Sequence, residues 1–174
     1  LSSITIKNDN LELAPLVAFD NDKFKNYLSE NNSKMFTLLK NYSEESYFKI
    51  NCPDDNNNFI VLGTFDTPES KVELEKDSVI ISTKVETRIV ENHCDMDFKS
   101  IKTYEKLQDK LEKSLKSDIK DLNTYLLDNN SDILSIEKLY YQKFKKDIDF
   151  TKLKYRYKAE VIANRNGLIF EVKK

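Results

Sequence analysis

The spacing of the apolar residues changes near Phe98, and this change is the feature that most limits the fold. Between Val79 and Ile89 apolar and polar residues alternate, which predicts a long strand with one buried and one wet face. From Phe98 to Leu126 the apolar residues recur at steps of three and four, which predicts an amphipathic helix of about eight turns. The stripe drifts by fours, so packing across a sheet is favoured over a coiled coil. The buried strand face comprises Val79, Ile81, Thr83, Val85, Thr87 and Ile89, and the helix stripe comprises Phe98, Ile101, Leu107, Leu111, Leu115, Ile119, Leu122 and Leu126.

Shorter segments precede the long strand. "LELAPLVAF" and "FKNYL" are joined by turn-forming residues at 20–23, which predicts a β-hairpin. Ser29 stands at an N-cap position before a short helix with one apolar face. Residues 47–52 and 59–65 predict two further strands, and "KVELE" predicts a third. The first half of the chain is therefore expected to be rich in strands.

A second helix and a closing strand are expected after the long helix. "NNSD" interrupts the helical pattern, and Ser131 or Asp132 is placed to cap a helix over "ILSIEKLYYQKF". The buried side of this helix comprises Ile133, Ile136, Leu139, Tyr140 and Phe144. In the closing strand one face carries Leu153, Tyr155, Tyr157, Ala159, Val161 and Ala163, and the other carries Lys154, Arg156, Lys158 and Glu160.

These segments together predict an α+β fold, an antiparallel sheet with a long amphipathic helix and a shorter helix packed on one face. We find no internal repeat and no linker-like stretch, so we expect a single domain over residues 1–174. No apolar run reaches the roughly 20 residues that span a bilayer. The chain begins without an initiator Met, so we expect an excised fragment whose targeting signal lies upstream.

The charge pattern does not favour nucleic acid as a partner. The formal net charge is -2, and nucleic-acid-binding domains usually carry a strongly basic patch. The closing strand does carry a row of cations, but its tyrosines lie on the opposite face, so stacking and charge would not share one surface. We interpret the cations as the wet face of a sheet.

Residues suited to catalysis or cofactor binding are sparse. The only two glycines, at 63 and 167, do not form a phosphate-binding loop, and His93 is the single imidazole available for a catalytic triad. The acid pairs Asp54–Asp55 and Asp95–Asp97 lack the ordered ligands of a calcium loop. We expect no enzymatic activity, no metal and no cofactor. A hydrolase that uses a pair of carboxylates stays open as an alternative.

The two cysteines, Cys52 and Cys94, have no motif spacing. Unmatched cysteines of this kind are more often free and partly buried, so we expect free thiols, with a disulfide as the less favoured alternative. His93 and Cys94 offer two adjacent donors without a matching pair, so zinc is not expected.

The order of these segments resembles the C-terminal domain of the Ger(x)C family, which contains the C subunits of spore germinant receptors. "LELAPLVAFDNDKFKNYLSE" looks like the family segment "G-AVF-DKLVGWL-E", and "KINCPDD" resembles a strand that often ends in Cys-Pro. "SDILSIEKLYYQKF" matches "DIFGFGE-L-RKYP" at Asp132, Ile133 and Glu137. The closing "KLKYRYKAEVIANRNGLI" is similar to "VEVKVKVKIRRTGLI", with Arg165, Gly167 and Leu168 as its most telling residues.

The resemblance covers almost the whole chain, with three departures. Ser135 stands where the family has glycine, Ala14 replaces a hairpin glycine, and no proline follows "YYQKF". The resemblance implies a non-enzymatic, soluble domain of a lipoprotein that is anchored to the outer face of the spore inner membrane by lipid on an upstream cysteine. It implies membrane-embedded A and B subunits as partners in nutrient-triggered germination, and the matched residues as possible partner contacts. A domain that binds a small germinant directly is the alternative.

Overall fold

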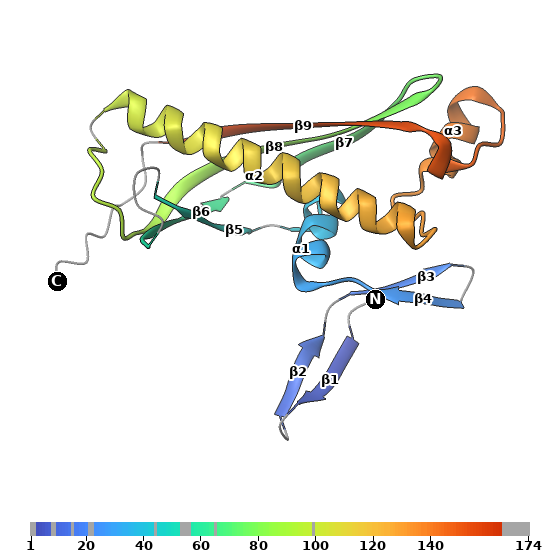
Figure 1. Ribbon diagram of the computed structural model, residues 1–174, viewed down its shortest axis with the longest axis horizontal. Helices are drawn as coiled ribbons and strands as arrows, with labels where there is room; N and C mark the ends of the chain where they lie inside the picture. Colours follow the sequence, from blue (N-terminus) through green and yellow to red (C-terminus); the bar gives the residue numbers. More distant parts are fainter. Residues whose placement is uncertain are drawn as a thin grey trace. The chain divides into compact units, whose positions relative to one another are not determined.

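The computed structural model describes residues 3–7, 10–14, 16–20, 23–43, 45–52, 57–64, 66–98 and 100–164 (Figure 1). Strands dominate the first half and helices the second, so the predicted α+β class is confirmed. The strands are β1 (Ser3–Lys7), β2 (Asn10–Ala14), β3 (Val17–Asp20), β4 (Lys23–Tyr27), β5 (Tyr47–Asn51), β6 (Phe59–Thr64), β7 (Glu69–Leu74), β8 (Ser78–Asn92) and β9 (Lys154–Ala163). The helices are α1 (Glu30–Leu39), α2 (Ile101–Asp128) and α3 (Ile136–Phe144), with a 3-10 turn, η1, at Phe150–Lys152.

The chain divides into two compact units, each assembled from separate segments. The first unit comprises Leu1–Thr37, Val72–Ile81 and Asp118–Tyr157, and the second comprises Leu38–Lys71, Ser82–Ser117 and Lys158–Lys174. The long elements β8, α2 and β9 each contribute residues to both units. The expectation of a single domain stays a prediction.

The hairpin expected near residue 20 forms from β3 and β4, and a second antiparallel pair forms from β1 and β2. The main sheet has the order β5-β6-β8-β7, and β9 pairs with β8. β6 is antiparallel to both β5, which precedes it directly, and β8, which follows it after β7. β7 joins β8 through a tight turn in which Glu75 N donates to Ser78 O at 2.8 Å. β7 pairs with β8 on one side only, so it is an edge strand of the sheet.

β9 follows β8 in the same direction. Lys154 N donates to the Asp77 carbonyl at one end, and Asn164 N donates to the Thr87 carbonyl at the other, so both strands advance in step (Figure 1). A parallel neighbour needs a long crossover connection, and α2 and α3 supply it. The antiparallel sheet predicted from the sequence is therefore extended by one parallel strand.

The predicted buried face is confirmed in β8 and, from Leu107 onward, in α2. The two earlier residues of the predicted helix stripe differ, because Phe98 is half-buried ahead of the helix and Ile101 is exposed. In β8 the side chains of Val79, Ile81, Thr83, Val85, Thr87 and Ile89 are all buried. In α2 the same holds for Leu107, Leu111, Leu115, Ile119, Leu122 and Leu126. In the second unit Gln108 Nε2 donates to the Val161 carbonyl, and in the first unit Asn123 Nδ2 donates to the Tyr157 hydroxyl. Each end of α2 thus packs on β9 in its own unit.

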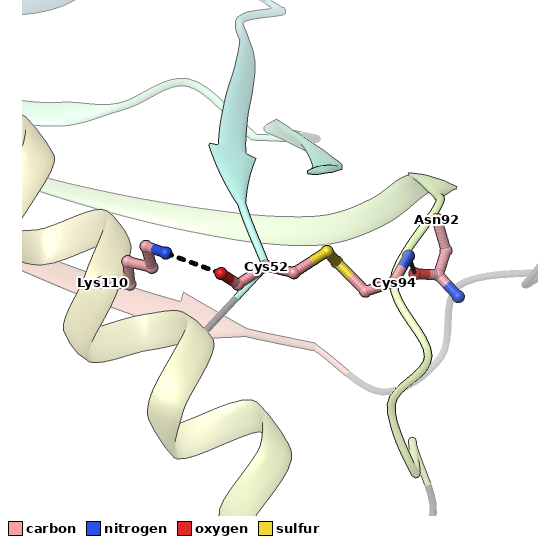
Figure 2. The surroundings of a disulfide bond; sticks show 4 residues. All are labelled: Cys52, Asn92, Cys94 and Lys110. Carbon is pink, nitrogen blue, oxygen red and sulfur yellow. Dashed lines mark hydrogen bonds between the residues drawn. A yellow bond between two sulfur atoms is a disulfide. The ribbon is translucent and has the colours of Figure 1, made fainter. Parts of the chain in front are cut away.

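Cys52 and Cys94 form a disulfide bond, so the expectation of free thiols is wrong (Figure 2). Cys52 follows β5, Cys94 follows β8, and their Cα atoms lie 5.7 Å apart. The two residues are 42 positions apart in sequence and meet because β6 pairs with both strands. Lys110 Nζ donates to the Cys52 carbonyl at 3.1 Å, and Cys94 N donates to Asn92 Oδ1 at 2.8 Å (Figure 2).

Candidate interaction surface

The start of α3 is organised by Asp132, one of the residues matched to the family motif. Its carboxylate accepts hydrogen bonds from Ile136 N at 2.7 Å and from Glu137 N at 2.9 Å. Its carbonyl accepts from Ser135 N at 2.9 Å. A carboxylate in this position satisfies N–H groups that a helix leaves open and interacts favourably with the helix dipole. Asp132 therefore fixes where α3 begins.

Ser135 adopts a backbone conformation that explains why a glycine suits this position. Its φ is 62° and its ψ is 39°, in the left-handed region that L-residues with a Cβ rarely occupy. Its side chain makes no capping hydrogen bond to the helix. The serine therefore occupies a strained turn that glycine would adopt without cost from a Cβ.

Glu137 connects α3 to the segment before β9. Its Oε1 accepts a hydrogen bond from Phe150 N at 3.2 Å, and the Tyr155 hydroxyl donates to the Phe150 carbonyl at 2.8 Å. Burial raises the pKa of Tyr155, and the nearby carboxylates of Asp132 and Glu137 raise it further. The structure thus brings Asp132 and Glu137 together around one tyrosine, and their observed contacts hold the fold of this region.

For the other residues matched to the family motif the structure gives less information. Ile133 is half-buried in the turn between α2 and α3. Arg165, Gly167 and Leu168 lie outside the described residues. A role of the matched residues as partner contacts stays a prediction.

Arg156, one of the three cations on the exposed face of β9, is paired within the protein, and so is Lys84 on the neighbouring β8. Arg156 forms an ion pair with Glu75 and also donates to Ser78 Oγ at 3.2 Å. On the same wet face Lys84 Nζ lies 3.6 Å from Glu160 Oε1. Because acids are interleaved with these cations, the face does not present the continuous positive charge that recruits a polyanion.

His93 packs against a neighbouring ring. Its imidazole lies 4.4 Å from the Phe59 ring, centroid to centroid, and its Nε2 lies 3.7 Å from Glu91 Oε2. Over the described part of the chain, no three His, Cys, Asp or Glu side chains come together as metal ligands would. Within the same residues, every helix is too short or too polar to cross a bilayer.

A groove lies where α3 meets β7 in the first unit. It is open to solvent, has a volume of about 680 Å³, and is lined by Val72, Glu73, Leu74, Glu75, Ile80, Leu139, Gln142 and Lys143. α3 is attached to the strand end by two side chains, because Tyr140 donates its hydroxyl to the Lys76 carbonyl and Lys143 donates its ammonium to the Leu74 carbonyl. The sequence predicted a strand over "KVELE" and the buried side of α3, but no local signal showed that the two meet.

Comparison with known proteins assigns the chain to a protein family. A family model described as "Spore germination B3/ GerAC like, C-terminal" matches residues 16–167. The fold is similar to that in the crystal structure of the GerBC protein, with a TM-score of 0.74 at 12% sequence identity. That alignment covers 94% of this chain and 55% of the other, so this chain spans about half the length of GerBC. Among curated protein sequences, none matches. The chain therefore belongs to the Spore germination B3/GerAC-like C-terminal family, the C-terminal domain family of spore germinant-receptor C subunits.

Proposed function

We propose that this chain is a non-enzymatic domain of a germinant-receptor C subunit that acts with membrane-embedded A and B subunits in nutrient-triggered spore germination. The match of the family model to residues 16–167 carries this proposal. The packing of the matched acids is consistent with it, because Asp132 and Glu137 bind backbone groups of the fold. The domain would contribute a surface for assembly and would not catalyse a reaction.

We further propose that the intact protein is a lipoprotein held at the outer face of the spore inner membrane by an upstream lipid anchor. The Cys52–Cys94 disulfide supports an extracytoplasmic location, since disulfides persist mainly in oxidising compartments. One lipid chain gives only marginal attachment, and contact with membrane subunits would supply the second anchoring interaction.

The test is a strain whose C subunit lacks this segment, with immunoblotting to establish that the shortened protein still accumulates in spores. We expect loss of the nutrient response and loss of A and B subunits from material purified through a tag on the C subunit. Germination by a route that bypasses the receptors serves as the control and should be normal. A full nutrient response in spores that contain only the shortened protein would overturn the proposal.

Direct binding of a small germinant is the second candidate, and the groove between β7 and α3 is the observation that favours it. Small-molecule sites usually enclose most of the ligand surface, whereas this groove is open to solvent. Saturation-transfer NMR of the 174-residue chain with a panel of single amino acids and sugars would test this candidate. Signal transfer that is lost in Leu139→Glu would support it, and no transfer from any member would remove it.

A further inference from the structure

The outer edge of β7 can be assigned residue by residue, because the neighbouring contacts fix which backbone groups face away from β8. Glu75 N donates to Ser78 O, so residue 75 points toward β8. Orientation alternates along an antiparallel strand, so the backbone groups of residues 70, 72 and 74 point outward. The hydroxyls of Ser70 and Thr83 lie 2.8 Å apart across the pair, as expected for residues opposite each other without a mutual backbone bond.

Two of the outward positions are already occupied. Asn41 Oδ1 accepts from Ser70 N at 2.9 Å, and Asn41 Nδ2 donates to the Ser70 carbonyl at 3.3 Å, so one side-chain amide replaces a neighbouring strand. Farther along, Lys143 Nζ donates to the Leu74 carbonyl at 2.5 Å. These contacts protect parts of an edge that would otherwise be open to pairing.

A short window remains between the protected positions. The structure gives Val72 N–H, Val72 C=O and Leu74 N–H no hydrogen-bond partner among the residues it describes. Two donors and one acceptor are therefore available at the two-residue spacing of a strand edge. Polar backbone groups strongly favour having a partner, so this window is suited to main-chain pairing.

The groove lies directly beside this window. Its apolar wall consists of Val72, Leu74, Ile80 and Leu139, and Gln142 and Lys143 stand at its polar end. Lys143 uses one of its three ammonium protons on the Leu74 carbonyl, so it retains donors for a further acceptor. Glu75 is paired with Arg156 and Ser78. The other charged residues that line the groove are Glu73 on β7 and Lys143 on α3, so the positive charge of the groove lies on its α3 side.

We propose that this groove binds an extended peptide segment of a partner protein as an additional strand on β7. The segment would pair with Val72 and Leu74, place an aliphatic side chain on the apolar wall, and bring an acidic group to Lys143. Grooves between an edge strand and a helix bind peptides in this mode, in which main-chain bonds give affinity and side-chain pockets give specificity.

A second copy of this chain is a poorer occupant. An antiparallel pairing of two β7 edges centred on Val72 would set Ser70 of one copy against Leu74 of the other. Asn41 already holds Ser70, and Lys143 already holds the Leu74 carbonyl, so only the central pair could form. The proposal concerns binding in solution and does not rest on the germination role.

The first measurement is amide hydrogen exchange of the free 174-residue chain by NMR. Val72 N–H should exchange much faster than the amides of Lys71 and Glu73, because those two point toward β8. A Val72 amide as protected as its two neighbours would overturn the assignment of an open edge.

The binding test begins with a random heptapeptide library displayed on phage and selected against the purified chain. Enriched peptides should carry alternating aliphatic residues and an acid, and a synthetic copy of one should protect the Val72 and Leu74 amides from exchange. Failure to enrich any peptide, or selection of peptides that shift other amides only, would overturn the proposal. Concentration-dependent dimerisation that protects Val72 without peptide would assign the edge to a second copy and overturn it equally.

Val72→Pro tests the Val72 N–H, because it removes this hydrogen-bond donor from the edge of β7. Proline is tolerated on an edge strand where the N–H faces solvent, so the variant should stay folded while losing one bond to the peptide. We expect affinity to fall about tenfold or more, the equivalent of one net hydrogen bond. Lys143→Gln, on the other wall of the groove, should weaken acidic peptides and spare their amide analogues, which covers the case in which the proline variant does not fold.

Lys49→Pro is the matched control. Lys49 lies on β5, an edge strand of the second unit, and its N–H also points outward, because Cys52 and Ser46 mark the hydrogen-bonded positions of the β5–β6 pair. Lys49→Pro also removes one outward N–H, together with the contact of the Lys49 ammonium with the Phe59 ring, and it should leave peptide affinity unchanged. Equal loss of affinity in both proline variants would overturn the assignment of the site to β7.

Discussion

At the scale of single residues, Ser135 has a backbone conformation that its Cβ disfavours. Its φ of 62° places a Cβ in the left-handed region, and no capping bond from the hydroxyl compensates. Asp132 and the first turn of α3 hold the segment in place around it. The turn is therefore maintained by its neighbours and not by the serine.

Ser135→Gly should stabilise the protein by about 1 kcal/mol, because glycine adopts the left-handed conformation without a clash from Cβ. Urea unfolding followed by circular dichroism measures the change. Ser114→Gly, on the exposed side of α2, is the control and should destabilise the helix by about 0.5 kcal/mol. A loss of stability in Ser135→Gly similar to that of the control would contradict the assigned strain.

Tyr155 is the second residue whose surroundings have a measurable consequence. Its pKa is raised above the ordinary value of 10.0, so the folded state holds the phenolic proton more tightly than the unfolded chain. This contribution to the free energy of unfolding is complete below about pH 10 and is lost as pH rises through the folded-state pKa.

Tyr155→Phe should therefore reduce the decline in stability above about pH 10, while lowering stability at neutral pH through loss of the bond to Phe150. Urea midpoints measured across this range provide the comparison. Tyr42→Phe is the control, because that ring is 74% exposed, and it should keep the alkaline decline of the parent protein. An unchanged slope in Tyr155→Phe would argue against the assignment.

At the scale of elements, α2 shows both the strength and the limit of periodicity. The stripe from Leu107 to Leu126 follows the predicted spacing and is buried. The helix, however, begins at Ile101, and that side chain is 59% exposed although the pattern placed it in the stripe. The Asp97 carbonyl accepts bonds from Ser100 N and the Thr103 hydroxyl, so a local turn precedes the helix. Spacing alone does not reveal such a turn.

Leu115→Ala should lower the free energy of unfolding by about 3 kcal/mol, because the side chain is fully buried and its removal leaves a cavity. Lys113→Ala, on the exposed side of the same helix, should change stability by no more than about 0.5 kcal/mol. Chemical denaturation of both variants measures the contrast. Similar values for the two would show that α2 does not bury this stripe in solution.

At the scale of the whole molecule, the Cys52–Cys94 disulfide closes a long covalent loop in the chain. Linking residues 42 positions apart reduces the entropy of the unfolded chain, and the loop-entropy relation gives about 4 kcal/mol for this separation. Native strain and residual structure usually make the measured value smaller.

Replacing Cys52 and Cys94 together by serine should therefore lower the free energy of unfolding by about 2–4 kcal/mol. The parent protein in reductant should match the double variant, and the double variant should not respond to reductant. Thermal unfolding with and without dithiothreitol measures both. A parent protein whose unfolding is indifferent to reductant would contradict the predicted contribution of the bond.

The order of elements and their buried faces could be predicted from the sequence because both depend on local spacing. The disulfide and the groove could not. Cys52 meets Cys94, and β7 meets α3, only after distant segments have been brought together by the sheet and the crossover helices. Asp132 and Glu137 were found through the family resemblance, whereas Val72 and Lys143 carry no motif that would single them out.

Asn41 both ends α1 and protects part of the β7 edge. Its φ of 56° lies in the left-handed region that asparagine tolerates better than most residues, and it follows the end of α1. The same residue turns the chain out of the helix and presents its amide to Ser70. Glycine would also preserve the turn, but it would uncover two more backbone groups of β7. The choice between two residues that can both end a helix therefore sets the length of the exposed edge.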